Sequence, residues 1–132
     1  MRILRFDGEV SREISQYGSV GLRLAPLAFG AGDIHVACMR LAPGGFVGAH
    51  QAASQQLFAV TQGAGWVQGG ERADATADSI EGERQPIREG YAALWEAGEW
   101  HAAGTATSMT ALVIEGPTLT PVHLATPDPA TP

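Results

Sequence analysis

Short alternating runs of apolar residues, separated by glycine and proline, limit most strongly how this chain can fold. The 132 residues include 17 glycines and 8 prolines, and so many turn-forming residues are hard to reconcile with a helical bundle. Between these breaks, apolar residues recur at every second position, as in residues 20–24 and 34–38. A period of two is typical of β-strands, and many short strands at near-regular spacing favour a sandwich or a barrel. We therefore predict an all-β fold.

The same pattern predicts where the strands lie. We expect strands over residues 20–24, 34–39, 57–62, 66–68, 91–95 and 109–114, with a break at Pro43-Gly44-Gly45 and turns at Gly63-Ala64-Gly65 and Ala97-Gly98. Residues 8–17 differ, because Val10, Ile14 and Tyr17 are spaced as on one face of a helix behind Asp7 as a cap. This spacing predicts a short N-terminal helix. Residues 70–86 are polar and acidic, which predicts a long surface loop.

Length and composition bound the organisation of the chain. At 132 residues it has the size of one domain. Five of the eight prolines lie between Pro117 and Pro132. We therefore expect a single barrel domain over residues 1–116 and an extended proline-rich arm over 117–132, frayed at its end.

The charge pattern excludes several classes of partner. The net charge of -6 and the absence of a basic cluster argue against a nucleic-acid partner. No apolar run is long enough for a signal peptide or a membrane span, and a single cysteine, Cys38, cannot form an internal disulfide. These features predict a soluble cytoplasmic protein. Cys38 lies in an alternating apolar run, so we interpret it as a small core residue rather than as a nucleophile.

Two stretches, residues 44–63 and 90–105, combine glycines and histidines at fixed spacing. They keep the spacings of the two motifs G-x5-H-x-H-x3-E-x6-G and G-x5-P-x-G-x2-H-x3-N. The spaced positions of the first motif are occupied by Gly44, His50, Ala52, Gln56 and Gly63. Those of the second motif are occupied by Gly90, Glu96, Gly98, His101 and Thr105. Here the chain resembles the cupin family. Both glycine frames and one histidine per motif are kept, whereas the second histidine, the glutamate, the proline and the asparagine are replaced.

The resemblance implies a small antiparallel jelly-roll barrel (a double-stranded β-helix) with a pocket at one mouth, and a homodimer as the default assembly. In metal-bearing cupins, the two histidines and the glutamate of the first motif, with the histidine of the second, hold one divalent ion. The paired signatures His-x-Ala-x3-Gln-Leu-Phe and Trp-Glu-Ala-Gly-Glu-Trp-His look like a small bacterial cupin subgroup without an assigned reaction. Here Ala52 removes one ligand and Gln56 removes a negative charge, so we expect metal affinity to fall.

Strand alternation suggests which side chains share the pocket. If Gln56 points inward, Phe58 points inward with it, and Glu99 accompanies His101 provided that residues 99–101 are extended. Tryptophan tends to line a pocket mouth because its N–H needs a partner. The residues expected in the ligand pocket are His50, Gln56, Phe58, Trp95, Glu99 and His101. His35 and His123 match no motif, and we interpret both as structural.

Three functions remain open from the sequence. The first is a binding or sensing module for a small polar or acidic molecule, built on His50, Gln56 and His101. The second is a metal-dependent enzyme of dioxygenase or isomerase type, in which His50, His101 and either Gln56 or Glu99 hold nickel, zinc, iron or manganese. The third is a structural dimer with a vestigial pocket. The lost ligands favour the first, in which the two histidines hydrogen-bond to each other, to Gln56 or to water.

The sequence also suggests how two chains could pair. Pro121-Val122-His123-Leu124 is an apolar patch in a polar, proline-rich arm. Because proline cannot donate a hydrogen bond to a strand ladder, the segment suits a sheet edge or a surface groove. The segment can lie on the barrel of a partner chain or on its own barrel. It forms a dimer contact only if it lies on the partner.

Overall fold

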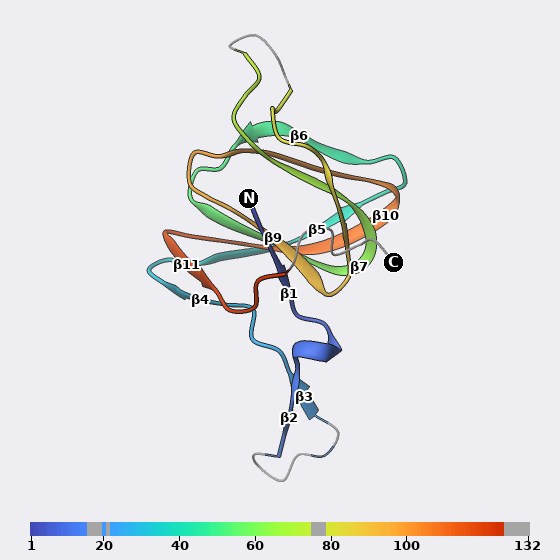
Figure 1. Cartoon of the computed structure of the whole chain (residues 1–132), viewed down its shortest axis with the longest axis vertical. Coiled ribbons are helices and arrows are strands. Elements are labelled where there is room, and N and C mark those ends of the chain that lie inside the picture. Colours follow the sequence, from blue (N-terminus) through green and yellow to red (C-terminus); the bar gives the residue numbers. More distant parts are fainter. Residues whose placement is uncertain (16–19, 21, 75–78, 126–132) are drawn as a thin grey trace.

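The computed structural model describes residues 1–15, 20, 22–74 and 79–125, and almost all of its regular structure is β-strand (Figure 1). The strands are β1 (Arg2–Arg5), β2 (Arg12–Ile14), β3 (Leu22–Leu24), β4 (Ala28–Ala31), β5 (His35–Leu41), β6 (Phe46–Gln51), β7 (Gln55–Gly70), β8 (Gln85–Arg88), β9 (Tyr91–Trp95), β10 (Trp100–Gly116) and β11 (Thr118–Pro121). Within this described part, no helix has the length and apolar character needed to cross a membrane.

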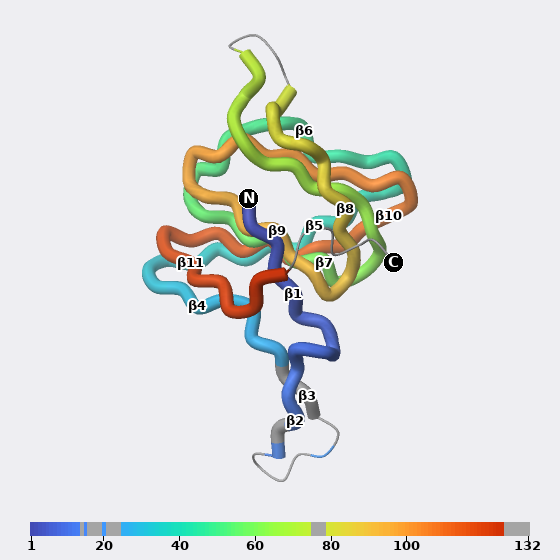
Figure 2. The backbone as a smooth tube through the Cα atoms, viewed as in Figure 1, coloured from blue at the N-terminus to red at the C-terminus, as the bar shows by residue number. Residues whose placement is uncertain are grey.

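Two long strands, β7 and β10, organise the barrel. The main sheet has the antiparallel order β1-β9-β7-β10-β5, with β6 added to β10 and β8 added to β7. Both long strands curve, so that the sheet closes around an interior (Figure 2). One half of β10 pairs with β6 and the other half with β5. The all-β jelly-roll prediction is therefore confirmed.

Apolar side chains pack on both faces of β7 and β9. Every second residue points into the barrel, where the buried cluster is Ile3, Phe58, Val60, Val67, Ile87, Tyr91, Ala93, Trp95, Ala103, Met109, Ala111 and Val113. The alternate residues form a second buried cluster on the outer face, which consists of Leu4, Leu57, Ala59, Ala92, Leu94 and Leu119. Leu119 comes from β11, which pairs with β4. The small β4–β11 sheet therefore covers a face that would otherwise be open to water.

The turn predicted at Gly63-Ala64-Gly65 is wrong, because β7 continues without a break through it. Gly63 has a positive φ of 84°, and the register with β10 shifts between Thr110 and Ala111. A side chain at residue 63 would collide with the carbonyl oxygen of Ser108. The register shift leaves Thr61 unpaired, two residues before Gly63, and this bulge bends one strand from one side of the barrel to the other.

The predicted helix over residues 8–17 is also wrong beyond its first turn. Gly8–Val10 forms a single 3-10 turn, and the Asp7 side chain makes no capping hydrogen bond. Ser11 is already extended, and Arg12–Ile14 then pairs with Leu22–Leu24 as the hairpin β2–β3. Sheet pairing has overridden the helical spacing of the apolar residues. Residues 16 and 17 of that prediction lie outside the described part of the chain.

The described part of the C-terminal arm packs on its own barrel. Thr118–Pro121 is β11, the backbone N–H of Arg5 donates to the His123 carbonyl at 3.1 Å, and that of Ala125 donates to the Ile3 carbonyl at 2.8 Å. Residues 118–125 are therefore bound to β1 and β4 of the same chain. Leu124 remains 59% exposed. The polar segment predicted as a loop begins after β7, with one isolated bridge between Arg72 and Ile80, and residues 75–78 lie outside the described part.

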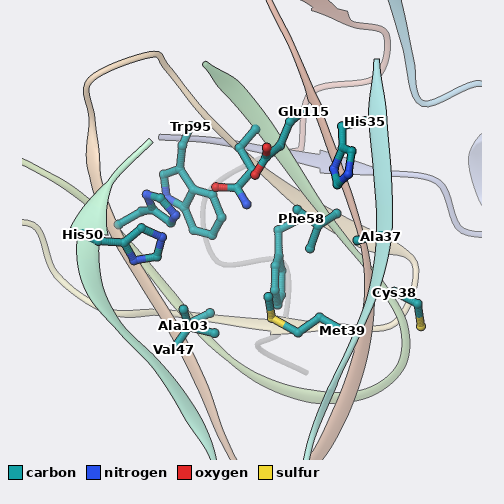
Figure 3. Close-up of a pocket in the computed structure, with 13 residues that line it drawn as sticks. His35, Ala37, Cys38, Met39, Val47, His50, Phe58, Trp95, Ala103 and Glu115 are labelled. Carbon is teal, nitrogen blue, oxygen red and sulfur yellow. The ribbon is translucent and has the colours of Figure 1, made fainter. Parts of the chain in front are cut away.

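The inward face of β5 is the opposite of the one expected. His35, Ala37 and Met39 line the interior, whereas Val36 is 57% exposed and Cys38 is exposed. Interpreting Cys38 as a core residue was wrong, because pairing with β10 turns its exposed side chain to the outer side of β5, so that Cys38 borders the pocket without pointing into it (Figure 3).

Candidate functional site

The candidate site is a cavity of about 350 Å³ inside the barrel, between the two halves of the sheet (Figure 3). Five strands supply its lining, and both signature motifs contribute to it. The lining residues are His35, Ala37, Cys38, Met39, Val47, His50, Gln56, Phe58, Trp95, His101, Ala103, Val113 and Glu115. Five of the six residues predicted for the pocket are among them. This volume suits a small organic molecule.

Four of these side chains form one row across neighbouring strands. Gln56 on β7 lies opposite Trp95 on β9 and opposite Glu115 on β10, and Glu115 in turn lies opposite His35 on β5. Directly opposed residues point to the same face of a sheet. The row Trp95–Gln56–Glu115–His35 therefore gives one end of the pocket a polar character, which we call the polar row.

The neighbouring row is apolar. Phe58 lies opposite Val113, and Val113 lies opposite Ala37. The rings of Phe58 and Trp95 have centroids 5.8 Å apart, and the Trp95 indole N–H donates to the Gln68 carbonyl at 3.1 Å. Because its N–H is already satisfied, Trp95 meets the pocket with an apolar part of its ring, although the residue is only 1% exposed and His101 lies against it.

The two motif histidines lie directly opposite each other on β6 and β10. Their ring centroids are 4.2 Å apart, and the His101 ring lies 4.5 Å from that of Trp95. His50 Nδ1 lies 2.7 Å from the Gly48 carbonyl oxygen, and His101 Nδ1 lies 3.5 Å from that of Glu99. A carbonyl oxygen only accepts, so Nδ1 carries the proton in both rings. With Nδ1 protonated, Nε2 is the nitrogen of each ring that faces other partners, and in an uncharged ring it is a hydrogen-bond acceptor.

His101 is held neutral by its surroundings. It is 3% exposed, and burial, with a smaller contribution from the adjacent His50, lowers the pKa of His101 to about 4. The Glu99 carbonyl and carboxylate oppose this shift without reversing it. At neutral pH, His101 is therefore uncharged and adds no positive charge to the pocket.

Gln56 is buried at the pocket wall, with 9% of its surface exposed. None of the described residues serves as a hydrogen-bond partner for its side-chain amide. Its amide atoms are open to the pocket, because no fully buried side-chain nitrogen or oxygen of the described residues lacks a partner. Among the described residues, the Gln56 amide therefore makes no hydrogen bond to the backbone. Its amide can donate to and accept from a molecule in the pocket.

Glu99 is not among the residues that line the pocket. Its carboxylate accepts from the Glu96 backbone N–H at 2.9 Å and pairs with the Met1 ammonium group at 2.7 Å. The inward orientation required residues 99–101 to be extended, but β10 begins only at Trp100. Placing Glu99 in the pocket was therefore wrong, because its carboxylate is engaged in the turn before the strand.

The residues present do not complete the metal centre of the cupin motifs. Among the described residues, no group of three histidine, cysteine, aspartate or glutamate side chains lies close enough to hold an ion. Ala52 is 5% exposed and brings only a methyl group to the second histidine position. Two imidazoles and a neutral amide are a poor set for a divalent ion.

The remaining motif positions support the backbone. All four motif glycines have a positive φ, at 79° for Gly44, 84° for Gly63, 89° for Gly90 and 83° for Gly98, a conformation that favours glycine over other residues. Thr105, at the asparagine position, donates from its hydroxyl to the Ala64 carbonyl at 2.6 Å. The motifs therefore specify the bends of the barrel even where their metal ligands are replaced.

The sequence analysis did not single out Glu115 and interpreted His35 as structural, and both belong to the polar row. Neither residue lies in a motif, and Glu115 is far from Gln56 in the sequence. For His35, the alternation of the strand offered a signal, because it places His35 on the same strand face as Met39. For Glu115, only the register of β10 against β7 shows that it lies beside Gln56.

Comparisons with known proteins support the fold. No family model and no curated protein matches the chain. Among solved structures, BH2720 from Bacillus halodurans aligns over 72% of this chain and 70% of its own, with 23% identity and a TM-score of 0.52. Vicilin from tomato, Solanum lycopersicum, aligns over 68% of this chain and 26% of its own, with 16% identity and a TM-score of 0.53.

A third similar structure is that of Drosophila melanogaster CENP-C. It aligns over 61% of this chain and 63% of its own, with 13% identity and a TM-score of 0.51. The chain thus spans less than two thirds of the Drosophila and tomato chains. At these identities the likeness concerns the fold alone, and in its fold this chain is a cupin barrel.

Proposed function

We propose that this protein binds a small organic molecule in the barrel pocket, through the side chains of His50, Gln56 and His101 and without a metal centre. The observation that carries the proposal is the Gln56 amide, which is 9% exposed and has no hydrogen-bond partner among the described residues. Because no fully buried side-chain nitrogen or oxygen of the described residues lacks a partner, the Gln56 amide atoms are open to the pocket. A ligand in the pocket can therefore pair with them directly.

The rest of the pocket supports the same function. Phe58, Trp95, Val113 and Ala37 give the pocket an apolar wall against which a ligand body can pack. Nε2 of His50 and of His101 supplies acceptors beside the Trp95 ring. A mostly apolar cavity with a few convergent polar groups is the usual form of a small-molecule site.

Ligand-observed NMR with a fragment library tests the proposal. We expect hits that compete for one site and that are lost in Gln56→Met and in Val113→Phe, because the first removes the polar partner and the second fills the cavity. Gln62→Met is the matched control, since Gln62 lies on the same strand but is exposed. Hits that survive both pocket variants bind elsewhere and contradict the proposal.

Metal addition separates this function from the metal-dependent enzyme. We expect nickel or zinc to leave the melting temperature of the protein unchanged, because the described side chains lack a third strong ligand. The double variant Ala52→His/Gln56→Glu restores the donor set of the family motif, and we expect nickel to raise its melting temperature.

The opposite result for the unaltered protein would favour the enzyme. Stoichiometric metal in protein purified without a histidine tag, lost in both His50→Ala and His101→Ala, would show that the two histidines recruit a ligand that the structure does not place beside them.

A further inference from the structure

We propose that the pocket selects organic cations, whose ammonium group is bound by the carboxylate of Glu115 in the polar row. This inference rests on the proposed function and names the class of molecule that the pocket takes. The charged residue in the lining, Glu115, lies outside both motifs.

Glu115 is the one carboxylate among the described residues that line the pocket, and no arginine lines it. The sequence contains no lysine that could reach it. Glu115 is half-buried between Gln56 and His35 of the neighbouring strands. It makes no ion pair with any residue that the structure describes. A cationic ligand would bring a countercharge to this carboxylate.

The groups around Glu115 also suit a cation. Trp95 lies two strands away in the same row, with only Gln56 between them, and Phe58 follows in the next row. Aromatic faces attract ammonium groups through their ring quadrupoles. Nε2 of His50 and of His101, together with the Gln56 amide oxygen, are acceptors that match the several N–H donors of an ammonium group.

An anionic ligand finds no such match. A ligand carboxylate at the same end of the pocket would face Glu115, and no arginine of the lining would compensate for the repulsion. The arrangement therefore separates ligands by the sign of their charge as well as by their shape.

Isothermal titration at pH 8 with matched molecules tests this selectivity. The set consists of phenethylamine, phenethyl alcohol and phenylpropionate, and of the same three end groups on a cyclohexyl body. At this pH, unperturbed histidines are neutral and alkylamines remain protonated. We expect the amines to bind about tenfold more tightly than the alcohols, and the carboxylates to bind most weakly.

Two variants assign the selectivity to Glu115. Glu115→Gln keeps the size of the side chain, so we expect the amine to fall to the affinity of the alcohol while the alcohol binds unchanged. Glu83→Gln makes the same change in net charge at an exposed position, and should leave the preference intact. A preference that persists in Glu115→Gln would overturn the inference.

The two proposals fail in different ways. If the three end groups bind with equal affinity, or if library hits show no preference for cations, the pocket binds ligands but the charge selectivity is wrong. If neither these molecules nor the library bind in the pocket, the proposed function fails and the inference fails with it.

Discussion

At the scale of single residues, the ring of His101 joins the stability of the barrel to its site. It lies between the rings of His50 and Trp95, 3% exposed. In the unfolded chain an imidazole binds a proton near pH 6.5, whereas the folded protein holds the pKa of His101 near 4. The folded state is therefore unaffected above pH 6.5 and loses stability as the pH falls toward 4.

This difference predicts a pH dependence that one substitution removes. Protonation of His101 should lower the free energy of unfolding by about 3 kcal/mol between pH 7 and pH 4. His101→Phe keeps the ring contact with Trp95 and should lose this part of the pH dependence in urea titrations. His123→Gln, outside the pocket, serves as the control. An NMR titration midpoint of His101 near 6.5 would contradict the prediction.

Much of the site could be predicted from the sequence because motif spacing fixes which residues share a strand face. His50, Gln56 and His101, with Phe58 and Trp95, were placed together in this way, and the structure brings them together. Glu115 could not be found, because its neighbours depend on register across two strands. Glu99 was misplaced because the strand was expected to include residue 99, whereas β10 begins one residue later, at Trp100.

At the scale of elements, strands could be predicted where apolar residues alternate clearly at every second position. The predictions failed where pairing with a distant strand or bending of a strand determines the local structure. Tyr91–Trp95 has the predicted bounds. Residues 12–14 pair in the β2–β3 ladder although the apolar spacing of residues 8–17 predicts a helix. The glycine-rich segment of β7 lies beside a bulge and does not form the predicted turn. In each case the deciding contact comes from a distant strand, which local sequence does not report.

The bulge of β7 gives a matched pair of glycine variants. Gly44→Ala and Gly63→Ala both force a side chain into a left-handed conformation, which costs about 1–2 kcal/mol. No atom lies within 4 Å of a side chain at Gly44, whereas one at Gly63 meets the Ser108 backbone. We therefore expect Gly63→Ala to lower the free energy of unfolding substantially more than Gly44→Ala. Equal losses in urea denaturation would show that the bulge tolerates the contact.

The strand β11 predicts a second pair. Leu119 is 5% exposed in the outer cluster, whereas Leu124 is 59% exposed. Leu119→Ala should cost about 2–4 kcal/mol of unfolding free energy, and Leu124→Ala well under 1 kcal/mol by the usual range for surface substitutions. A chain that ends at Gly116 should melt at a lower temperature, because it uncovers Leu57 and Leu94. An unchanged melting temperature would contradict the covering role of this strand.

At the scale of the whole molecule, we propose that two copies pair through the outer face of β5. This strand ends the order of the main sheet, and its outward residues and their neighbours are apolar. Ile34 is 44%, Val36 57% and Leu112 39% exposed. The described arm residues are bound to their own barrel, which leaves this face as the better candidate. An exposed apolar patch beside a sheet edge favours association.

Light scattering tests the pairing. The unaltered protein should have twice the mass of one 13.8 kDa chain, and Val36→Asp should shift it to a single chain. Thr120→Asp is the control, since Thr120 is exposed on β11, away from β5. A dimer that survives Val36→Asp would place the contact elsewhere, and a monomeric unaltered protein would remove the dimer.

The position of β10 in the chain has a consequence for the time course of folding. This strand pairs with β5, β6 and β7, all of which are synthesised before it. Until residue 116 has left the ribosome, the nascent chain holds strands whose central partner does not yet exist. Contacts of such long sequence separation form slowly, in milliseconds to seconds. The apolar edge of β5 is therefore exposed during synthesis, when its capture by a chaperone or by another nascent chain competes with closure of the barrel.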